Sequence, residues 1–180
     1  MNLSELGIKA RAASVLLAKM NVETKNKTLI ACADALVKES NGILEANAKD
    51  VLIGREKGMN EGLVDRLMLT EERIKGIAEG LEQVAALDDP VGEVLDMKKR
   101  PNGLLIGKKR VPLGVVGMIY EARPNVTPDA FALCFKSGNA VILRGGSDAI
   151  NSNIAIVKVL QDTLKACGIT EDAVQLIEDT

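Results

Sequence analysis

The fold is constrained most by a change in hydrophobic pattern along the chain, from helical periodicity in the first half to short apolar runs in the second. Up to about residue 88, apolar residues recur at spacings of three and four, which is the spacing of a helix face. One such face comprises Leu29, Ile30, Cys32, Ala33, Leu36 and Val37. After Asp88-Asp89-Pro90, short apolar runs separated by turn residues replace this periodicity. The sequence therefore predicts a helical segment over residues 1–88, followed by a part that contains strands.

Residues 93–112 are predicted to form a β-hairpin. Pro101-Asn102-Gly103 is a turn signal between the run ending at Arg100 and the run that starts at Leu104. A turn centred on Asn102 and Gly103 would place Asp96 opposite Lys109. Two strands alone are marginal in water, so we expect this hairpin to pack against another subunit in a homo-oligomer.

The hairpin is also strongly basic, with Lys98-Lys99-Arg100 on one strand and Lys108-Lys109-Arg110 on the other. A nucleic-acid patch is one interpretation, but aromatic residues that could stack on bases make up only 2% of the chain. Lysines that protect exposed strand edges are the better explanation.

Residues 113–180 predict a parallel βαβαβ unit of the α/β class. Apolar runs suited to buried parallel strands alternate with helical stretches, and right-handed crossovers are expected. Thr127, Pro128 and Asp129 supply an N-cap, a proline at the first helical position and an acid in the first turn. The strands are expected at 114–119, 140–143 and 174–177, and the second helix from about Ala149 to Cys167, closed by Gly168.

Composition narrows the function. A net charge of -2 gives no general attraction to nucleic acid or to an anionic membrane, and no apolar run is long enough to cross a bilayer, so the cytoplasm is the expected compartment. Without histidine, a structural zinc site and a Ser-His or Cys-His pair are excluded, and we expect no metal. Cys32, Cys134 and Cys167 are all expected to be buried structural thiols rather than nucleophiles.

Ligands of an open parallel sheet bind beyond the carboxyl ends of its strands. We therefore expect one lip of the sheet, the side formed by the carboxyl ends of its strands, to carry residues 120–126, Arg144-Gly145-Gly146-Ser147 and the segment 178–180. The tetrapeptide could bind an anion through glycine N–H groups, a cation and a helix N-terminus. By itself it better fits a turn in which the glycines supply unusual φ angles and Ser147 caps the helix.

The segment Glu121-Ala122-Arg123-Pro124-Asn125 carries both charge signs and an amide. These groups could orient a substrate at the end of the first strand of the sheet. A loop built on a proline and a turn-forming asparagine explains them equally well. The segment alone does not decide between the two.

The stretch from Val111 to Asn153, VPLGVVGMIYEARPNVTPDAFALCFKSGNAVILRGGSDAINSN, resembles the γ-glutamyl phosphate reductases of the aldehyde dehydrogenase superfamily. Its EARPNVT and NAVILRGGS motifs are specific to that family, and the upstream helical region matches as well. The resemblance implies an incomplete, aldehyde dehydrogenase-like cofactor domain with a Rossmann-like sheet, formed by the N-terminal part of the enzyme. The domain that bears the catalytic cysteine is absent, so we expect the coding sequence to continue past Thr180.

By this resemblance, Asn125 helps to form the oxyanion hole. Arg123 is the candidate for binding the acidic substrate. The residues implied in binding NADPH are Ile119, Tyr120, Glu121, Arg144, Gly145, Gly146 and Ser147. Among them Arg144 and Ser147 would hold the adenine ribose and its 2'-phosphate. Asp148 stands where the family usually has Glu, which affects the expected ribose contact.

The implied reaction is NADPH-dependent reduction of γ-glutamyl phosphate to glutamate 5-semialdehyde and phosphate in proline biosynthesis, with glutamate 5-kinase as a functional associate. The chain alone is expected to be inactive. One alternative is the reductase portion of a bifunctional pyrroline-5-carboxylate synthase. A different alternative is a non-catalytic helical interaction module, favoured if the gene ends at Thr180.

Overall fold

A computed structural model describes residues 2–179; Met1 and Thr180, the outer ends of the predicted segments, lie outside the described residues. Five helices precede the strands, as the helical periodicity predicts. They are α1 (Leu3–Leu17), α2 (Val22–Lys38), α3 (Ser40–Glu56), α4 (Glu61–Leu67) and α5 (Glu71–Ala86). Thr70 is the N-cap of α5, and its hydroxyl accepts a hydrogen bond from the N–H of Arg73 at 3.2 Å.

The hairpin forms between β1 (Val94–Lys99) and β2 (Leu105–Lys109), but its predicted register was wrong by one residue. Asp96 lies opposite Lys108, not Lys109. The cause is a longer turn: Gly103 has a φ of +87°, and the N–H of Arg100 donates to the carbonyl of Leu104. A three-residue connection with glycine in the left-handed region shifts the strands relative to a two-residue turn.

The second sheet is parallel, in the order β3 (Val115–Ile119), β4 (Ala140–Arg144) and β5 (Val174–Leu176). Helix α6 (Val126–Lys136) connects β3 to β4. A short 3-10 turn, η1 (Ser147–Ala149), leads into α7 (Ile150–Ala166), and a second one, η2 (Glu171–Ala173), leads into β5. The predicted βαβαβ unit is present.

Helix α6 begins earlier than predicted, and Thr127 is not its N-cap. Asn125 takes the capping position without a side-chain hydrogen bond to the helix, and Pro128 falls at the third helical position. The hydroxyl of Thr127 bonds instead to Tyr120, which directly follows β3, and to Asn153 in α7. Local capping chemistry at Thr127 is therefore overridden by tertiary hydrogen bonds.

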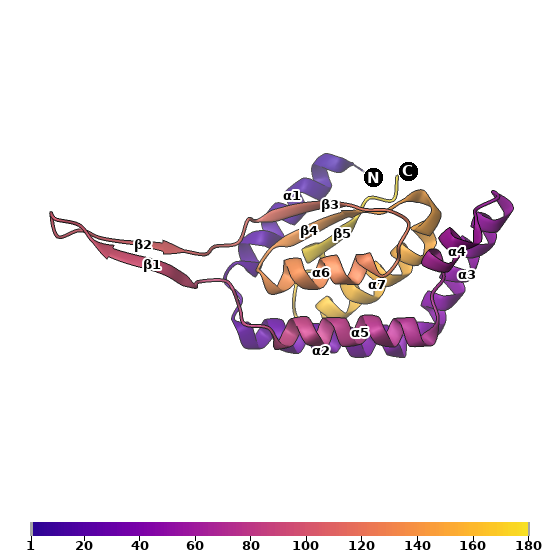
Figure 1. The fold of residues 1–180 in the computed structure, drawn as a ribbon, viewed down its shortest axis with the longest axis horizontal. Helices are drawn as coiled ribbons and strands as arrows, with labels where there is room; N and C mark the ends of the chain where they lie inside the picture. Colours follow the sequence, from indigo (N-terminus) through magenta and orange to yellow (C-terminus); the bar gives the residue numbers. More distant parts are fainter. Residues whose placement is uncertain (1, 180) are drawn as a thin grey trace.

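The elements stack in layers (Figure 1). Helix α1 covers one face of the parallel sheet, α6 and α7 cover the other, and α2 and α5 pack side by side against α6 and α7. The core is mostly aliphatic, with the rings of Phe131 and Phe135 in contact at a centroid distance of 5.3 Å and tilted by 33°. No helix within residues 2–179 is long and apolar enough to span a membrane.

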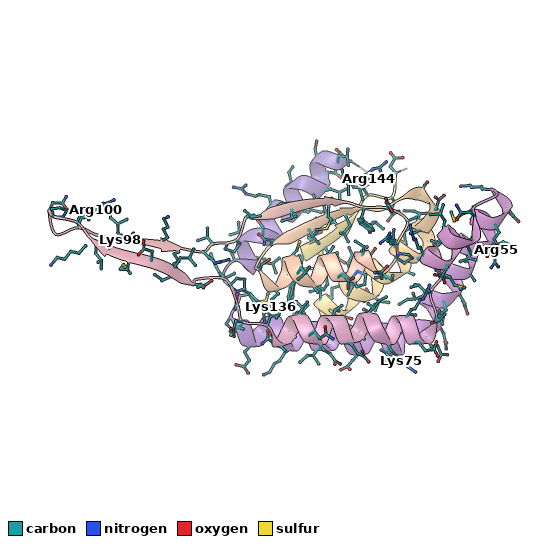
Figure 2. All side chains as sticks on the ribbon, viewed as in Figure 1. Arg55, Lys75, Lys98, Arg100, Lys136 and Arg144 are labelled. Atoms are coloured by element: carbon teal, nitrogen blue, oxygen red, sulfur yellow. The ribbon has the colours of Figure 1, made fainter. Side chains whose placement is uncertain are left out.

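The hairpin projects away from this body as a long arm (Figure 1). Lys98 and Arg100 lie on that arm, whereas Arg144 lies on the body of the molecule, far from the tip of the arm (Figure 2). The arm exposes a set of large apolar side chains: Val94, Leu95, Met97, Leu104, Leu105 and Ile106.

Candidate functional site

The two predicted site segments meet at the carboxyl ends of β3 and β4. Ile119 pairs with Arg144 in the parallel register, and the N–H of Tyr120 donates to the carbonyl of Arg144 at 3.1 Å. Arg144 and Ser147 are exposed, as is Glu121 across the lip. The sheet therefore brings residues 119–121 and 144–147 together, as expected for neighbouring parallel strands.

Gly145 and Gly146 are required for close packing, not for unusual φ angles. Neither has a positive φ, so the expected conformational reason for them is wrong. A Cβ on Gly145 would lie 2.3 Å from Nδ2 of Asn153, and one on Gly146 would lie 3.1 Å from the backbone N of Ala122. The glycines allow the loop after β4 to rest directly on the loop after β3.

Ser147 does not cap the helix that follows, because α7 starts only at Ile150. The first turn of α7 is capped by Asp50, a buried carboxylate from the middle of α3. Asp50 accepts hydrogen bonds from the N–H of Ser152 at 2.7 Å and the N–H of Asn151 at 3.2 Å, and from both side chains. An internal anion thus already occupies the N-terminus of α7, so a phosphate at this lip would depend on side chains and loop N–H groups.

A buried chain of hydrogen bonds lies beneath the glycine loop. The hydroxyl of Thr127 donates to Oδ1 of Asn153 at 2.8 Å, so its 2.6 Å contact with Tyr120 must use the phenol as donor. Burial raises the pKa of Tyr120, which keeps the phenol protonated for that role. The side chain of Tyr120 therefore supports the lip from below, while its backbone remains at the edge.

Arg123 and Asn125 line a second feature, a hollow of about 620 Å³ between the start of α6, the exposed face of α5 and the end of α4. Both side chains are exposed. Arg123 Nε lies 4.0 Å from the Glu121 carboxylate, at the outer limit of an ion pair. The structure thus places the amide of Asn125 and the cation of Arg123 in one concave surface.

Another arginine that lines the hollow, Arg73, uses its guanidinium for hydrogen bonds within the protein. Its guanidinium donates to the carbonyls of Asp65 and Met68 and, at 2.8 Å, to the carboxylate of Asp65. These bonds join the end of α4 to the start of α5. Arg73 therefore shapes the wall of the hollow, whereas Arg123 has donors left for a ligand.

Asp129 also lines this hollow and was not recognised from the sequence as a site residue. Burial raises the pKa of its carboxyl, and a contact with the Asn125 side chain opposes that shift. Residues four apart on a helix share a face, so the spacing from Asn125 was the available signal. An acidic residue in the first turn of a helix is common, and this explained the presence of Asp129 without a role in a site.

The cysteines lie away from the lip. Cys32 and Cys134 are buried as expected, and burial raises the pKa of Cys32 to about 12, with a smaller contribution from Cys167. The expectation that Cys167 is buried was wrong, because it is exposed at the C-cap of α7. Helix α7 runs from the carboxyl end of β4 back to the amino end of β5. Cys167, at the end of α7, is therefore remote from Asn125 and Arg144.

Comparisons with known proteins give consistent results. The chain is 56% identical over 179 residues to γ-glutamyl phosphate reductase of Lachnospira eligens, covering 99% of this chain and 43% of that protein. It is 59% identical over 172 residues to that of Caldanaerobacter subterraneus, covering 96% and 42%. The chain thus spans about two fifths of the length of these curated relatives. No protein-family model matches it.

Solved structures agree with these relatives. The γ-glutamyl phosphate reductase of Thermotoga maritima superposes with a TM-score of 0.96 at 46% identity, covering all of this chain and 44% of that one. A probable aldehyde dehydrogenase from Listeria monocytogenes superposes with a TM-score of 0.73 at 16% identity, over 97% of this chain and 36% of that one. The latter likeness establishes an aldehyde dehydrogenase-like fold, over the part that is covered.

Proposed function

Because this chain belongs to the γ-glutamyl phosphate reductase family, we propose that it supplies the cofactor half-site and part of the acyl site of such an enzyme. The reaction is the NADPH-dependent reduction of γ-glutamyl phosphate to glutamate 5-semialdehyde and phosphate, a step of proline biosynthesis in the cytoplasm. The observation that carries the proposal is the joint placement of Asn125 and Arg123 in one hollow, on the loop that pairs with the end of β4.

The end of β4 is suited to the phosphorylated ribose of NADPH. Arg144 is an exposed cation beside the exposed hydroxyl of Ser147, and Gly145 and Gly146 keep Cβ atoms out of the loop. Because Asp50 fills the N-terminus of α7, the guanidinium of Arg144 is the principal positive charge for a 2'-phosphate. NADPH, when bound, supplies the hydride.

Asn125 acts on the acyl group. When a thiolate attacks the acyl carbon of γ-glutamyl phosphate, negative charge develops on the carbonyl oxygen, phosphate leaves and a thioester forms on the cysteine. An amide N–H directed at that oxygen stabilises the charge by about 3 kcal/mol. Asn125 provides this donor, and Arg123 attracts the anionic substrate.

The nucleophile comes from outside residues 1–180. Cys32 and Cys134 are buried, with thiol pKa values raised by burial, and Cys167 is remote from the hollow. A reactive thiolate needs a lowered pKa and access to the substrate. The 180-residue chain by itself is therefore inactive.

The test is the reverse reaction. The complete reductase and the isolated chain are each mixed with glutamate 5-semialdehyde, phosphate and NADP+, and the appearance of NADPH is followed. We expect phosphate-dependent turnover from the complete enzyme and none from the isolated chain. Failure of the complete enzyme to form NADPH contradicts the proposed activity, and turnover by the isolated chain contradicts the assignment of the nucleophile. Replacement of NADP+ by NAD+ tests the role given to Arg144.

A further inference from the structure

Asp129 presents a carboxylate to the hollow without a cationic partner. None of the ion pairs described for residues 2–179 includes it, although Arg66, Arg73 and Arg123 line the same hollow. The carboxylate lies above α5, where a Cβ added to Gly80 would be 3.7 Å from Oδ1 of Asp129. An anion in this position has lost part of its hydration without gaining a counter-charge.

On α5 the hollow is lined by Gly76 as well as by the side chains of Arg73 and Ile77. Gly76 and Gly80 are one turn apart on that helix, and neither has the positive φ that would require glycine. Glycine inside a helix is about 1 kcal/mol less favourable than alanine. No atom outside the helix lies within 4 Å of a Cβ built on Gly76, so the space opposite α6 is open. Gly76 therefore leaves room for a ligand in the hollow, whereas Gly80 lets the Asp129 carboxylate approach α5 closely.

The arrangement of charges matches an amino acid better than a simple acid. Arg123 offers a cation, Asp129 offers an anion, and Asn125 provides the amide between them in sequence. An α-amino acid carries the two complementary charges on one carbon. A surface selective for a carboxylic acid without the amino group would have no use for an unpaired carboxylate.

The spacing also matches. Asn125 and Asp129 are four residues apart at the start of α6, which is about 6 Å along a helix axis. In γ-glutamyl phosphate four bonds of about 1.5 Å separate the acyl carbon from the ammonium nitrogen, or about 5 Å when extended. Because the Asn125 and Asp129 side chains are in contact in the structure, a substrate whose reacting carbonyl lies at Asn125 brings its ammonium group to Asp129 by replacing that contact.

We propose that Asp129 binds the α-ammonium group of the substrate and makes the enzyme selective for an amino-acid acyl phosphate. This inference rests on the proposed function and adds a specificity-determining residue to it. A charge-assisted hydrogen bond from the ammonium group stabilises the carboxylate, and Arg123 pairs with the α-carboxylate. The raised pKa of Asp129 agrees, since a cationic ligand removes the penalty of an unpaired, half-buried charge.

The experiment compares two aldehydes in the reverse reaction of the complete reductase. They are glutamate 5-semialdehyde and 5-oxopentanoate, which lacks only the amino group. We expect the parent enzyme to prefer the amino-acid aldehyde by about tenfold or more in kcat/KM, because a carboxylate site left without its ammonium partner disfavours the analogue. In Asp129→Asn this preference should fall towards one through loss of activity on the amino-acid aldehyde, with the KM for NADP+ unchanged.

The controls separate a specificity role from a structural one. Glu79→Gln removes an exposed acid from the same region without touching the hollow and should leave the preference intact. Asp129→Glu keeps the charge and should retain more of the preference than Asp129→Asn. An equal loss of kcat/KM on both aldehydes, or an unchanged preference in Asp129→Asn, overturns the inference while the proposed function stands. A parent enzyme inactive on glutamate 5-semialdehyde overturns both.

Discussion

The carboxylate of Asp50 in α3 accepts a hydrogen bond from the backbone N–H of Ser152 in α7 at 2.7 Å, across 102 positions of sequence. Ser152 in turn accepts a hydrogen bond from Asn47, whose other contacts hold the main chain at Leu67 and Leu69. This buried network ties the helical segment to the helix that follows the glycine loop. It connects the end of α4, which lines the hollow, to the helix that follows the lip of the sheet.

Asp50→Asn should lower the stability of the complete reductase, because the neutral amide removes a charge-assisted cap at the α7 N-terminus. We expect a loss of about 2 kcal/mol and a fall in Tm of several degrees. Thermal unfolding of the variant measures it. The control is Asp34→Asn, an exposed acid of α2 that should leave the Tm within about a degree. A parent-like Tm for Asp50→Asn would mean that the cap is dispensable.

Gly145→Ala should damage the cofactor lip, because the new Cβ would meet Nδ2 of Asn153 at 2.3 Å. Since Asn153 is fully buried, the loop must move instead. We expect the Kd for NADPH to rise by about tenfold or more, measured by fluorescence titration. Gly117→Ala in β3 is the matched control, because its Cβ would have no neighbour within 4 Å. Equal affinities for the two variants would contradict the packing role of Gly145.

Arg144→Glu should weaken NADPH binding much more than it weakens folding. The change reverses the charge beside the proposed 2'-phosphate, whereas an exposed substitution usually alters stability by only about 0.5 kcal/mol. Calorimetric titration and thermal unfolding of the same preparation separate the two effects. Lys75→Glu reverses an exposed charge on α5, away from the lip, and should keep parental affinity (Figure 2). An unchanged Kd for Arg144→Glu removes this residue from the cofactor site.

The hairpin arm should make subunit contacts in the complete enzyme, because it exposes a row of apolar side chains far from the body (Figure 1). Leu105→Glu and Ile106→Glu place one charge on each face of the arm, because adjacent strand residues point to opposite faces. We expect the double variant to sediment as a smaller species than the parent in analytical ultracentrifugation. A parent that is monomeric at high concentration would contradict this prediction outright.

Much of the fold could be predicted from local patterns. The helical periodicity before residue 88 and the alternation after Gly114 both depend on neighbours in sequence, and both appear in the structure. The wrong details share a different origin. The Thr127 hydroxyl forms hydrogen bonds with Tyr120 and Asn153 instead of capping its own helix. Helix α7 is capped by Asp50 of α3 rather than by Ser147. Such long-range partners leave no local pattern.

In the candidate site, too, some features could be predicted from the sequence and others could not. Parallel strands bring their carboxyl ends together, so the meeting of residues 119–121 with Arg144 could be anticipated. The packing role of Gly145 depends on Asn153, and the hollow depends on where α5 passes α6. Asp129 was overlooked because its position at the start of a helix already had a local explanation.

The role of Asn125 is tested most directly by the kcat of Asn125→Ala in the complete reductase, measured with glutamate 5-semialdehyde, phosphate and NADP+. Removing a donor aimed at the developing oxyanion should lower kcat by about a hundredfold to a thousandfold. The KM for NADP+ and the Tm should stay close to those of the parent, since Asn125 is exposed and its side chain does not cap α6. A kcat within about twofold of the parent would contradict the placement of the reacting carbonyl at Asn125.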